Sequence, residues 1–195
     1  MSEWRLFPEG VVPECTTAAW YEGRERAPHL EQDGHRQRIE LTAEFVRSLA
    51  DGYGLRSVSD LGCGDGGLLS LLASSGLSAW GYDLSPEAVK GAVERGVTAY
   101  QMDVVNDWPS LGDLAVAGEM LEHLVNPHAF VRRLRSGCAY AVASSPFTET
   151  AASHYEFHTW AWDLEGYRAL FENSGWRVVR QETVQSFQVI AAVGA

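Results

Sequence analysis

Apolar residues repeat along the chain with two different periods, and each change of period predicts a change of secondary structure. Residues 1–34 contain three prolines and three glycines and show neither period, so we expect an irregular N-terminal segment. From His35 onward, apolar residues recur at steps of three and four, which predicts a helix. The apolar positions of this helix are Ile39, Ala43, Val46, Leu49 and Ala50.

Short apolar runs and helical segments follow each other from there to the end of the chain. Strands are predicted over 57–61, 79–82, 98–102, 114–118, 139–143, 176–179 and 187–193, and helices over 68–73, 86–96, 127–137 and 164–175. Helix starts are indicated by Ser85-Pro86, Asn126-Pro127 and Asp163. The last two strands leave no room for a helix between them and should therefore be antiparallel. The pattern predicts one doubly wound α/β domain over residues 1–195, with its core in 35–195.

A glycine-rich loop, "SDLGCGDGG" (residues 59–67), follows the first of these strands. Gly62, Gly64 and Gly67 fit the G-x-G-x-x-G pattern of dinucleotide-binding proteins. Acidic residues accompany this loop and the ends of the later strands, where ligands of such sheets bind. They are Asp60, Asp65, Asp83, Asp103 and Glu119.

These carboxylates favour a ligand without phosphates. Asp60 and Asp65 would face a pyrophosphate, and like charges at about 4 Å cost roughly 1–4 kcal/mol each. With a nucleoside that carries cationic groups, such as S-adenosylmethionine, the interaction with these carboxylates would be attractive instead. Asp60 would then favour the cationic end, and Asp83 would accept the ribose hydroxyls. Asp103 would accept the adenine amino group or, alternatively, cap a turn at Asn106.

The remaining expected cofactor contacts are apolar or lie in the backbone. The glycines would permit close backbone approach, and Met102 and Val104 would lie against the adenine. Leu84, directly after Asp83, is also expected to contact the cofactor.

Several stretches together resemble the class I S-adenosylmethionine-dependent methyltransferases over roughly residues 35–195. They are "DLGCGDGGLLSLLA", "GYDLSPEAV", "QMDV", "AGEMLEHLVNPHAFVRRL" and "ENSGWRVV". The resemblance implies a Rossmann-like seven-stranded sheet of order 3-2-1-4-5-7-6 with the last strand antiparallel and helices on both faces. It also implies S-adenosylmethionine as cofactor and S-adenosylhomocysteine as product. Matching cofactor positions are Asp60, Gly62, Gly64, Gly66, Asp83, Asp103 and Glu119, the last beneath the methionine part.

The methyl acceptor should lie beyond the sulfonium, under segments outside the sheet. Candidates are residues 1–34, the turn after Ser144-Ser145-Pro146, and "HYEFHTWAW" (154–162), which is equally consistent with a packed lid or a strand extension. Methyl transfer mainly needs alignment. His123, His154 and His158 are candidate bases for an acceptor that must lose a proton.

The stretch "EMLEHL" permits a metal-dependent alternative. Similar stretches occur in the ubiquinone-pathway O-methyltransferases and in the enzymes that 2′-O-methylate small-RNA 3′ ends. In the RNA enzymes the acids and two histidines hold a divalent cation, which here would involve Glu119, Glu122, His123 and His158 or His154. Such ligands suit Mg²⁺ or Mn²⁺. We do not favour a metal, because many methyltransferases with a similar segment bind none, and in them the histidine at the position of His123 packs beside the following helix.

Composition narrows the function further. The net charge of −11 and the dispersed arginines disfavour nucleic acid as a partner. No apolar run is long enough to span a membrane, the N-terminus does not resemble a signal peptide, and the three cysteines form no motif, so a cytoplasmic protein is expected. We therefore expect methyl transfer to an oxygen or nitrogen atom of a small organic acceptor, with oxygen preferred over nitrogen or carbon. The alternatives are a metal-dependent RNA 2′-O-methyltransferase, a non-catalytic S-adenosylmethionine-binding subunit and, last, a dehydrogenase. The sequence does not predict the oligomeric state.

Overall fold

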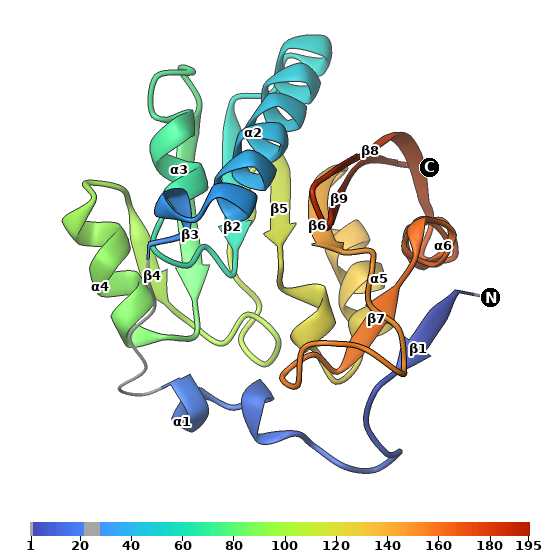
Figure 1. Ribbon diagram of the computed structural model, residues 1–195. Coiled ribbons are helices and arrows are strands. Elements are labelled where there is room, and N and C mark those ends of the chain that lie inside the picture. The colour runs from blue at the N-terminus through green and yellow to red at the C-terminus, as the bar shows by residue number, and fades with distance from the viewer. Residues whose placement is uncertain (1, 22–27) are drawn as a thin grey trace.

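A seven-stranded sheet organises the computed structural model, which describes residues 2–21 and 28–195 (Figure 1). The strands lie in the order β4-β3-β2-β5-β6-β9-β8. Their bounds are β2 (Ser57–Leu61), β3 (Ser78–Asp83), β4 (Ala99–Gln101), β5 (Leu114–Gly118), β6 (Tyr140–Pro146), β8 (Trp176–Val184) and β9 (Phe187–Gly194). β9 runs opposite to the other strands of this sheet, because it pairs antiparallel with β6 and with β8. When the seven strands of this sheet are numbered 1 to 7 in chain order, their spatial order is 3-2-1-4-5-7-6. The predicted topology is therefore confirmed.

Helices cover both faces of the sheet, as predicted. The longer ones are α2 (Asp33–Tyr53), α3 (Gly67–Leu72), α4 (Pro86–Glu94), α5 (Pro127–Gly137) and α6 (Leu164–Glu172). Residues of α2 and α3 pack with Val58, Val116 and Val142 in one buried cluster. Residues of α5 and α6 pack with Ala115 and Ala117 in another. Neighbouring residues of β5 thus enter opposite cores, which is the period-two pattern of a strand buried on both faces.

Three of these helices begin at the side-chain caps that the sequence indicated. Ser85 Oγ accepts the Ala88 N–H at 3.2 Å, and Pro86 opens α4. Asn126 Oδ1 caps α5 and Asp163 Oδ1 caps α6, each by accepting a backbone N–H at 2.9 Å. Caps of this kind contribute about 1 kcal/mol each.

The N-terminal segment contains short elements where the sequence predicts an irregular chain. They are β1 (Glu3–Arg5), η1 (Glu14–Thr16), α1 (Ala18–Tyr21) and η2 (His29–Glu31). β1 pairs antiparallel with β7 (Trp160–Trp162), so part of "HYEFHTWAW" is a strand. Glu3 fixes this pairing, since its carboxylate accepts the Trp162 indole N–H at 2.8 Å and contacts His128 Nε2 at 3.0 Å. Partners more than 120 residues away leave no local periodicity to predict them from.

Some element bounds also differ from those predicted. Helix α2 begins two residues before His35, and β6 continues through Ser145 to Pro146, where Pro146 pairs with Phe187. Across the described ranges 2–21 and 28–195, no helix is long and apolar enough to cross a membrane.

Candidate active site

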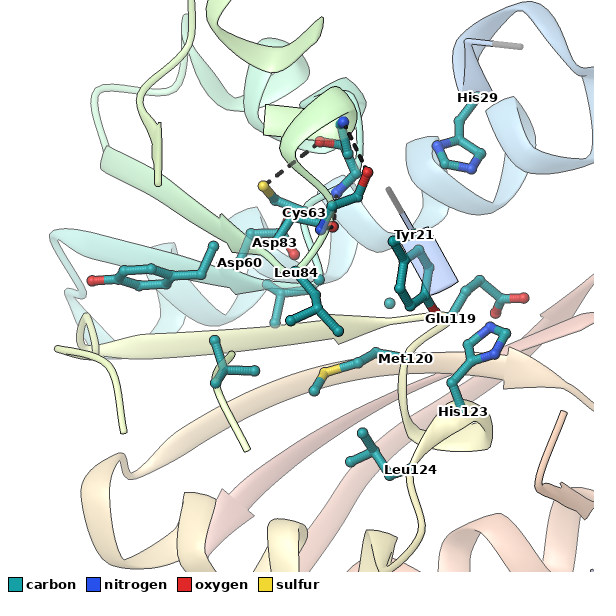
Figure 2. Close-up of a pocket in the computed structure, with 18 of the residues that line it drawn as sticks. Tyr21, His29, Asp60, Cys63, Asp83, Leu84, Glu119, Met120, His123 and Leu124 are labelled. Carbon is teal, nitrogen blue, oxygen red and sulfur yellow. Dashed lines mark hydrogen bonds between the residues drawn. The ribbon is translucent and has the colours of Figure 1, made fainter. Parts of the chain in front are cut away.

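A cavity of about 1610 Å³ lies at the carboxyl ends of the parallel strands, beside the glycine loop. Helix α1 lies beyond this edge of the sheet (Figure 1), and Tyr21 of α1 and His29 of η2 both line the cavity. Figure 2 shows Asp60 and Asp83 on one side of the cavity and Glu119 and His123 on the other. The cavity therefore joins the strand-end acids to the histidine-rich stretches in one space.

The glycine loop has a backbone that other residues rarely adopt. Gly62, Gly64 and Gly66 have φ angles of 76°, 55° and 75°. A Cβ on Gly66 would lie 2.6 Å from Val97 Cγ2, which is too close for a side chain. The loop thus needs glycine both for its conformation and for its packing against the chain after α4.

Asp83, at the end of β3, is held in place by the backbone. Its Oδ2 accepts the Gly64 N–H and its Oδ1 accepts the Ser85 N–H, both at 2.8 Å. Each carboxylate oxygen can accept more than one hydrogen bond. Asp83 also lines the cavity, where its carboxylate can accept further hydrogen bonds from a ligand.

Asp60, at the end of β2, is 4% exposed and lines the same cavity. Burial raises its pKa from 3.8 to about 7; nearby Arg38 opposes the shift and Asp83 adds to it. The folded protein therefore pays a free-energy cost to ionise this carboxyl. A cation bound beside it would lower that cost.

Asp65, the second acid of the loop, is bound by side chains of the protein itself. His29 Nδ1 lies 3.2 Å from its Oδ1, and the Arg95 guanidinium contacts both its carboxylate and its carbonyl oxygen. Burial acts to raise the pKa of Asp65, but the hydrogen bond and charge of His29 and the charge of Arg95 hold it at about 2. Because the Asp65 charge is already paired, Asp60 is the loop carboxylate that would oppose a pyrophosphate.

Asp103 follows β4 and caps a turn. Its Oδ1 accepts the backbone N–H groups of Val105 and Asn106 at 3.0 and 3.2 Å, and its Oδ2 accepts the Asn106 side-chain amide at 2.8 Å. This is the alternative that the sequence left open. Asp103 still lines the cavity, together with Leu84, Met102 and Val104.

A hydrogen-bonded chain leads from α2 to the end of β5. Arg38 Nη1 donates to Ser144 Oγ at 3.2 Å, and the Ser144 hydroxyl donates to Glu119 Oε1 at 3.1 Å. Glu119 has a φ of 53°, a conformation that non-glycine residues adopt mainly at sites under local constraint. Burial raises the pKa of Glu119. The charge of Arg38 and the hydrogen bond from Ser144 partly counteract this shift.

Beyond Glu119, one carboxylate and two imidazoles come together. Ligand atoms of Glu122, His123 and His158 all lie within 4.8 Å of one another. His123 donates through Nδ1 to the Phe157 carbonyl at 3.1 Å, and His158 Nδ1 lies 2.6 Å from Glu149 Oε2. These contacts orient both rings.

Glu122 is 1% exposed, and both its carboxylate oxygens lack a hydrogen-bond partner among the described residues. Burial, followed by the charge of Glu119, raises its pKa well above the usual value. A buried carboxyl in this situation is either protonated or compensated by a cation.

Two of the predicted residues do not join this group of three. Glu119 is bound to Ser144 instead. His154 is exposed, hydrogen-bonds the Tyr155 carbonyl and does not line the cavity, so its position gives no support to a catalytic role. The structure thus brings together three of the five residues named for a metal.

Several residues of the site are not among those predicted from the sequence. Arg38 is 6% exposed and lies in the apolar stripe of α2, where a charged residue is itself a signal. No sequence pattern marks Glu149 as a site residue, because its contact with His158 depends on the folded conformation of the loop. Trp20 of α1 packs against Phe157 with ring centroids 4.8 Å apart, which joins the N-terminal segment to the stretch 154–162.

Comparison with known proteins identifies the family. The methyltransferase domain family matches residues 33–182 of this chain. Ubiquinone biosynthesis O-methyltransferase of Proteus mirabilis is 32% identical over 101 residues, which cover 47% of this chain and 41% of that protein. The same enzyme of Xanthomonas euvesicatoria is 36% identical over 102 residues, covering 48% and 42%. The chain spans less than half the length of these curated relatives.

Solved structures support the fold. Magnesium protoporphyrin IX methyltransferase from Synechocystis PCC 6803, crystallised with bound S-adenosylhomocysteine, superposes with a TM-score of 0.69 at 19% identity. That match covers 91% of this chain and 92% of the other. A small RNA methyltransferase gives a TM-score of 0.72 at 18% identity, covering 89% of this chain and 27% of its own. With most of its length inside the matched region, the chain belongs to the methyltransferase domain family, among the class I S-adenosylmethionine-dependent methyltransferases.

Proposed function

We propose that this protein transfers the methyl group of S-adenosylmethionine to an oxygen atom of a small organic acceptor. The observation that carries the proposal is the single cavity, which has the backbone-held carboxylate of Asp83 at one end and the imidazoles of His123 and His158 at the other. The first end suits a nucleoside and the second suits a hydroxyl group that must lose a proton.

The nucleoside would bind along the ends of β2, β3 and β4. In this proposal the Asp83 carboxylate accepts the ribose hydroxyls, and Leu84, Met102 and Val104 enclose the adenine. The Asp103 carboxylate already has three donors from its own turn, so it would accept the adenine amino group only as an additional bond. Apolar enclosure therefore carries more of the adenine binding than this acid.

The methionine part would lie beside the backbone of Gly62 and Gly64. Asp60 and Glu119 would favour its ammonium group and the sulfonium, since both carboxyls have raised pKa values that a nearby cation would lower. Arg38 would attract the methionine carboxylate. Its Nε is buried without a hydrogen-bond partner among the described residues, and it lines the same cavity.

Methyl transfer is an in-line displacement, in which the acceptor oxygen forms a bond to the methyl carbon as the bond to sulfur breaks. The enzyme contributes mainly by holding the two atoms in line. The acceptor proton would pass to His158 or His123, whose rings are oriented by Glu149 and by the Phe157 carbonyl. The ubiquinone enzymes named above are O-methyltransferases, which supports an oxygen acceptor.

A radiolabel assay tests this function. The protein is incubated with S-adenosylmethionine labelled in the methyl group and with panels of phenols, catechols, carboxylates and amines. We expect label to appear in a hydroxyl-bearing acceptor and the signal to fall in His158→Ala. His154→Ala is the matched control, because this exposed histidine of the same loop should leave the rate unchanged. Transfer only to amines, or equal loss in both variants, would contradict the proposal.

A divalent metal is the second candidate, favoured by the grouping of Glu122, His123 and His158. These residues fit Mg²⁺ or Mn²⁺, since the Glu122 carboxylate is buried and lacks a partner among the described residues. A bound metal would act as a Lewis acid on the acceptor hydroxyl. An RNA 3′-terminal 2′-hydroxyl is the alternative acceptor for such a site.

Mn²⁺ titration followed by electron paramagnetic resonance tests the metal. Binding that disappears in Glu122→Gln and persists in the exposed control Glu156→Gln would support it. Absence of binding by the native protein would exclude it. Adding RNA 3′ ends to the acceptor panel distinguishes the two acceptor classes.

A further inference from the structure

Glu149 and His158 form a close carboxylate–imidazole pair at the acceptor end of the cavity. Glu149 Oε2 lies 2.6 Å from His158 Nδ1, and the two side chains are 16% and 9% exposed. Both line the cavity. A hydrogen bond to a carboxylate that is this protected from water is stronger than one at the surface.

The second carboxylate oxygen of Glu149 is also engaged. Oε1 accepts the backbone N–H of Tyr155 at 3.1 Å. Glu149 comes from the loop after β6, whereas Tyr155 and His158 belong to the segment before β7. The carboxylate therefore joins two loops, and neither of its oxygens is left to rotate without losing a hydrogen bond.

Thr159, the residue after His158, anchors this part of the backbone to the segment that contains Glu122 and Leu124. Thr159 donates its backbone N–H to the Glu122 carbonyl at 2.6 Å. Its hydroxyl lies 2.8 and 2.7 Å from the carbonyl oxygens of Glu122 and Leu124. The backbone beside His158 thus has little freedom, and the remaining variables are the orientation of the imidazole ring and the position of its proton.

A carboxylate can only accept a hydrogen bond, so Nδ1 of His158 must carry the proton that joins it to Glu149. In the neutral ring, Nε2 is then the basic nitrogen. We infer that Glu149 is a positioning residue, which holds His158 in the Nδ1–H tautomer and presents its unprotonated Nε2 to the acceptor end of the cavity. In assigning that nitrogen to the acceptor, the inference rests on the function proposed above. Nε2 is the atom required either to receive a proton or to bind a metal.

Nitrogen-15 NMR of histidine-labelled protein tests the tautomer without requiring an acceptor. Protonated and unprotonated imidazole nitrogens have well-separated ¹⁵N shifts, and His158→Gln assigns the resonances. At a pH where His158 is neutral, we expect native His158 to be Nδ1–H. In Glu149→Ala the Nε2–H tautomer should become populated, and the isosteric Glu149→Gln, which retains a carbonyl acceptor, should keep more of the native form.

Glu156→Gln is the matched control, because it removes one negative charge from an exposed position two residues before His158. It should leave the His158 spectrum unchanged. The inference is overturned if native His158 is Nε2–H, if Glu149→Ala keeps the native tautomer, or if Glu156→Gln shifts it equally. Glu149→Gln preserves shape and so provides the comparison if Glu149→Ala does not fold.

Kinetics separates a positioning role from a merely structural one. Glu149→Ala should lower kcat by roughly 10- to 100-fold and leave the KM for S-adenosylmethionine unchanged. Glu149→Gln should recover part of the loss, and a raised cofactor KM with unchanged kcat would overturn the inference. Because the tautomer is measured without an acceptor, a failure of the proposed methyl transfer and a failure of the Glu149 assignment remain distinguishable.

Discussion

Replacing Asp60 with Asn should stabilise the protein without cofactor, increasingly so as the pH rises. The pKa of Asp60 is raised on folding from 3.8 to about 7. A carboxyl with a raised folded-state pKa binds more protons in the folded state, so its contribution to stability is lost as pH rises between these two values. Integrating over that interval gives a cost of about 2 kcal/mol at pH 5 and about 4 kcal/mol at pH 8.

Urea unfolding of the native protein and Asp60→Asn at these two pH values measures this cost. The variant should gain about 2–3 kcal/mol more over the native protein at pH 8 than at pH 5. Asp51→Asn, an exposed change in α2, is the control and should show no such difference. An Asp60→Asn effect that is independent of pH would refute the reasoning, because it would mean that Asp60 titrates alike in the folded and unfolded chains.

Three further predictions concern the glycine loop and the cavity. Asp83→Ala should weaken S-adenosylmethionine binding by roughly 1–3 kcal/mol in calorimetry, since a charged acceptor held by two backbone donors is lost; unchanged affinity would remove Asp83 from the ribose site. Gly66→Ala should lower the free energy of unfolding by about 2–4 kcal/mol through its positive φ and its clash with Val97, and a neutral result in urea unfolding would contradict the packing described. Arg38→Met should weaken the binding of S-adenosylhomocysteine more than that of adenosine in competition binding, because only the former carries the amino-acid carboxylate; an equal effect on both would exclude that contact.

The sheet was predictable because its signals are local. Each strand is a short apolar run, and the turns and caps are marked by residues with a specific backbone role, such as Ser85 before α4 and Gly96 after it. The strand-end acids were predictable for the same reason. A residue at the carboxyl end of a parallel strand faces the ligand edge whatever the rest of the chain does.

Contacts between distant segments were not predictable in this way. The pairing of β1 with β7 joins residues more than 150 positions apart. The Glu149–His158 pair is close in sequence, but it depends on how the chain turns between the two residues, which no local pattern marks. Asp65 illustrates the same limit. Its sequence position suggested a ligand contact, whereas His29 and Arg95 reach it only in the folded chain.

A crystal structure with S-adenosylhomocysteine tests the central claim most directly, namely that one cavity holds the nucleoside at Asp83 and the reacting sulfur toward the histidines. We predict the ribose hydroxyls at the Asp83 carboxylate, the amino-acid group near Asp60 and Arg38, and the sulfur facing His123 and His158. A nucleoside bound outside this cavity, or one bound with its sulfur directed away from the two imidazoles, would contradict the account.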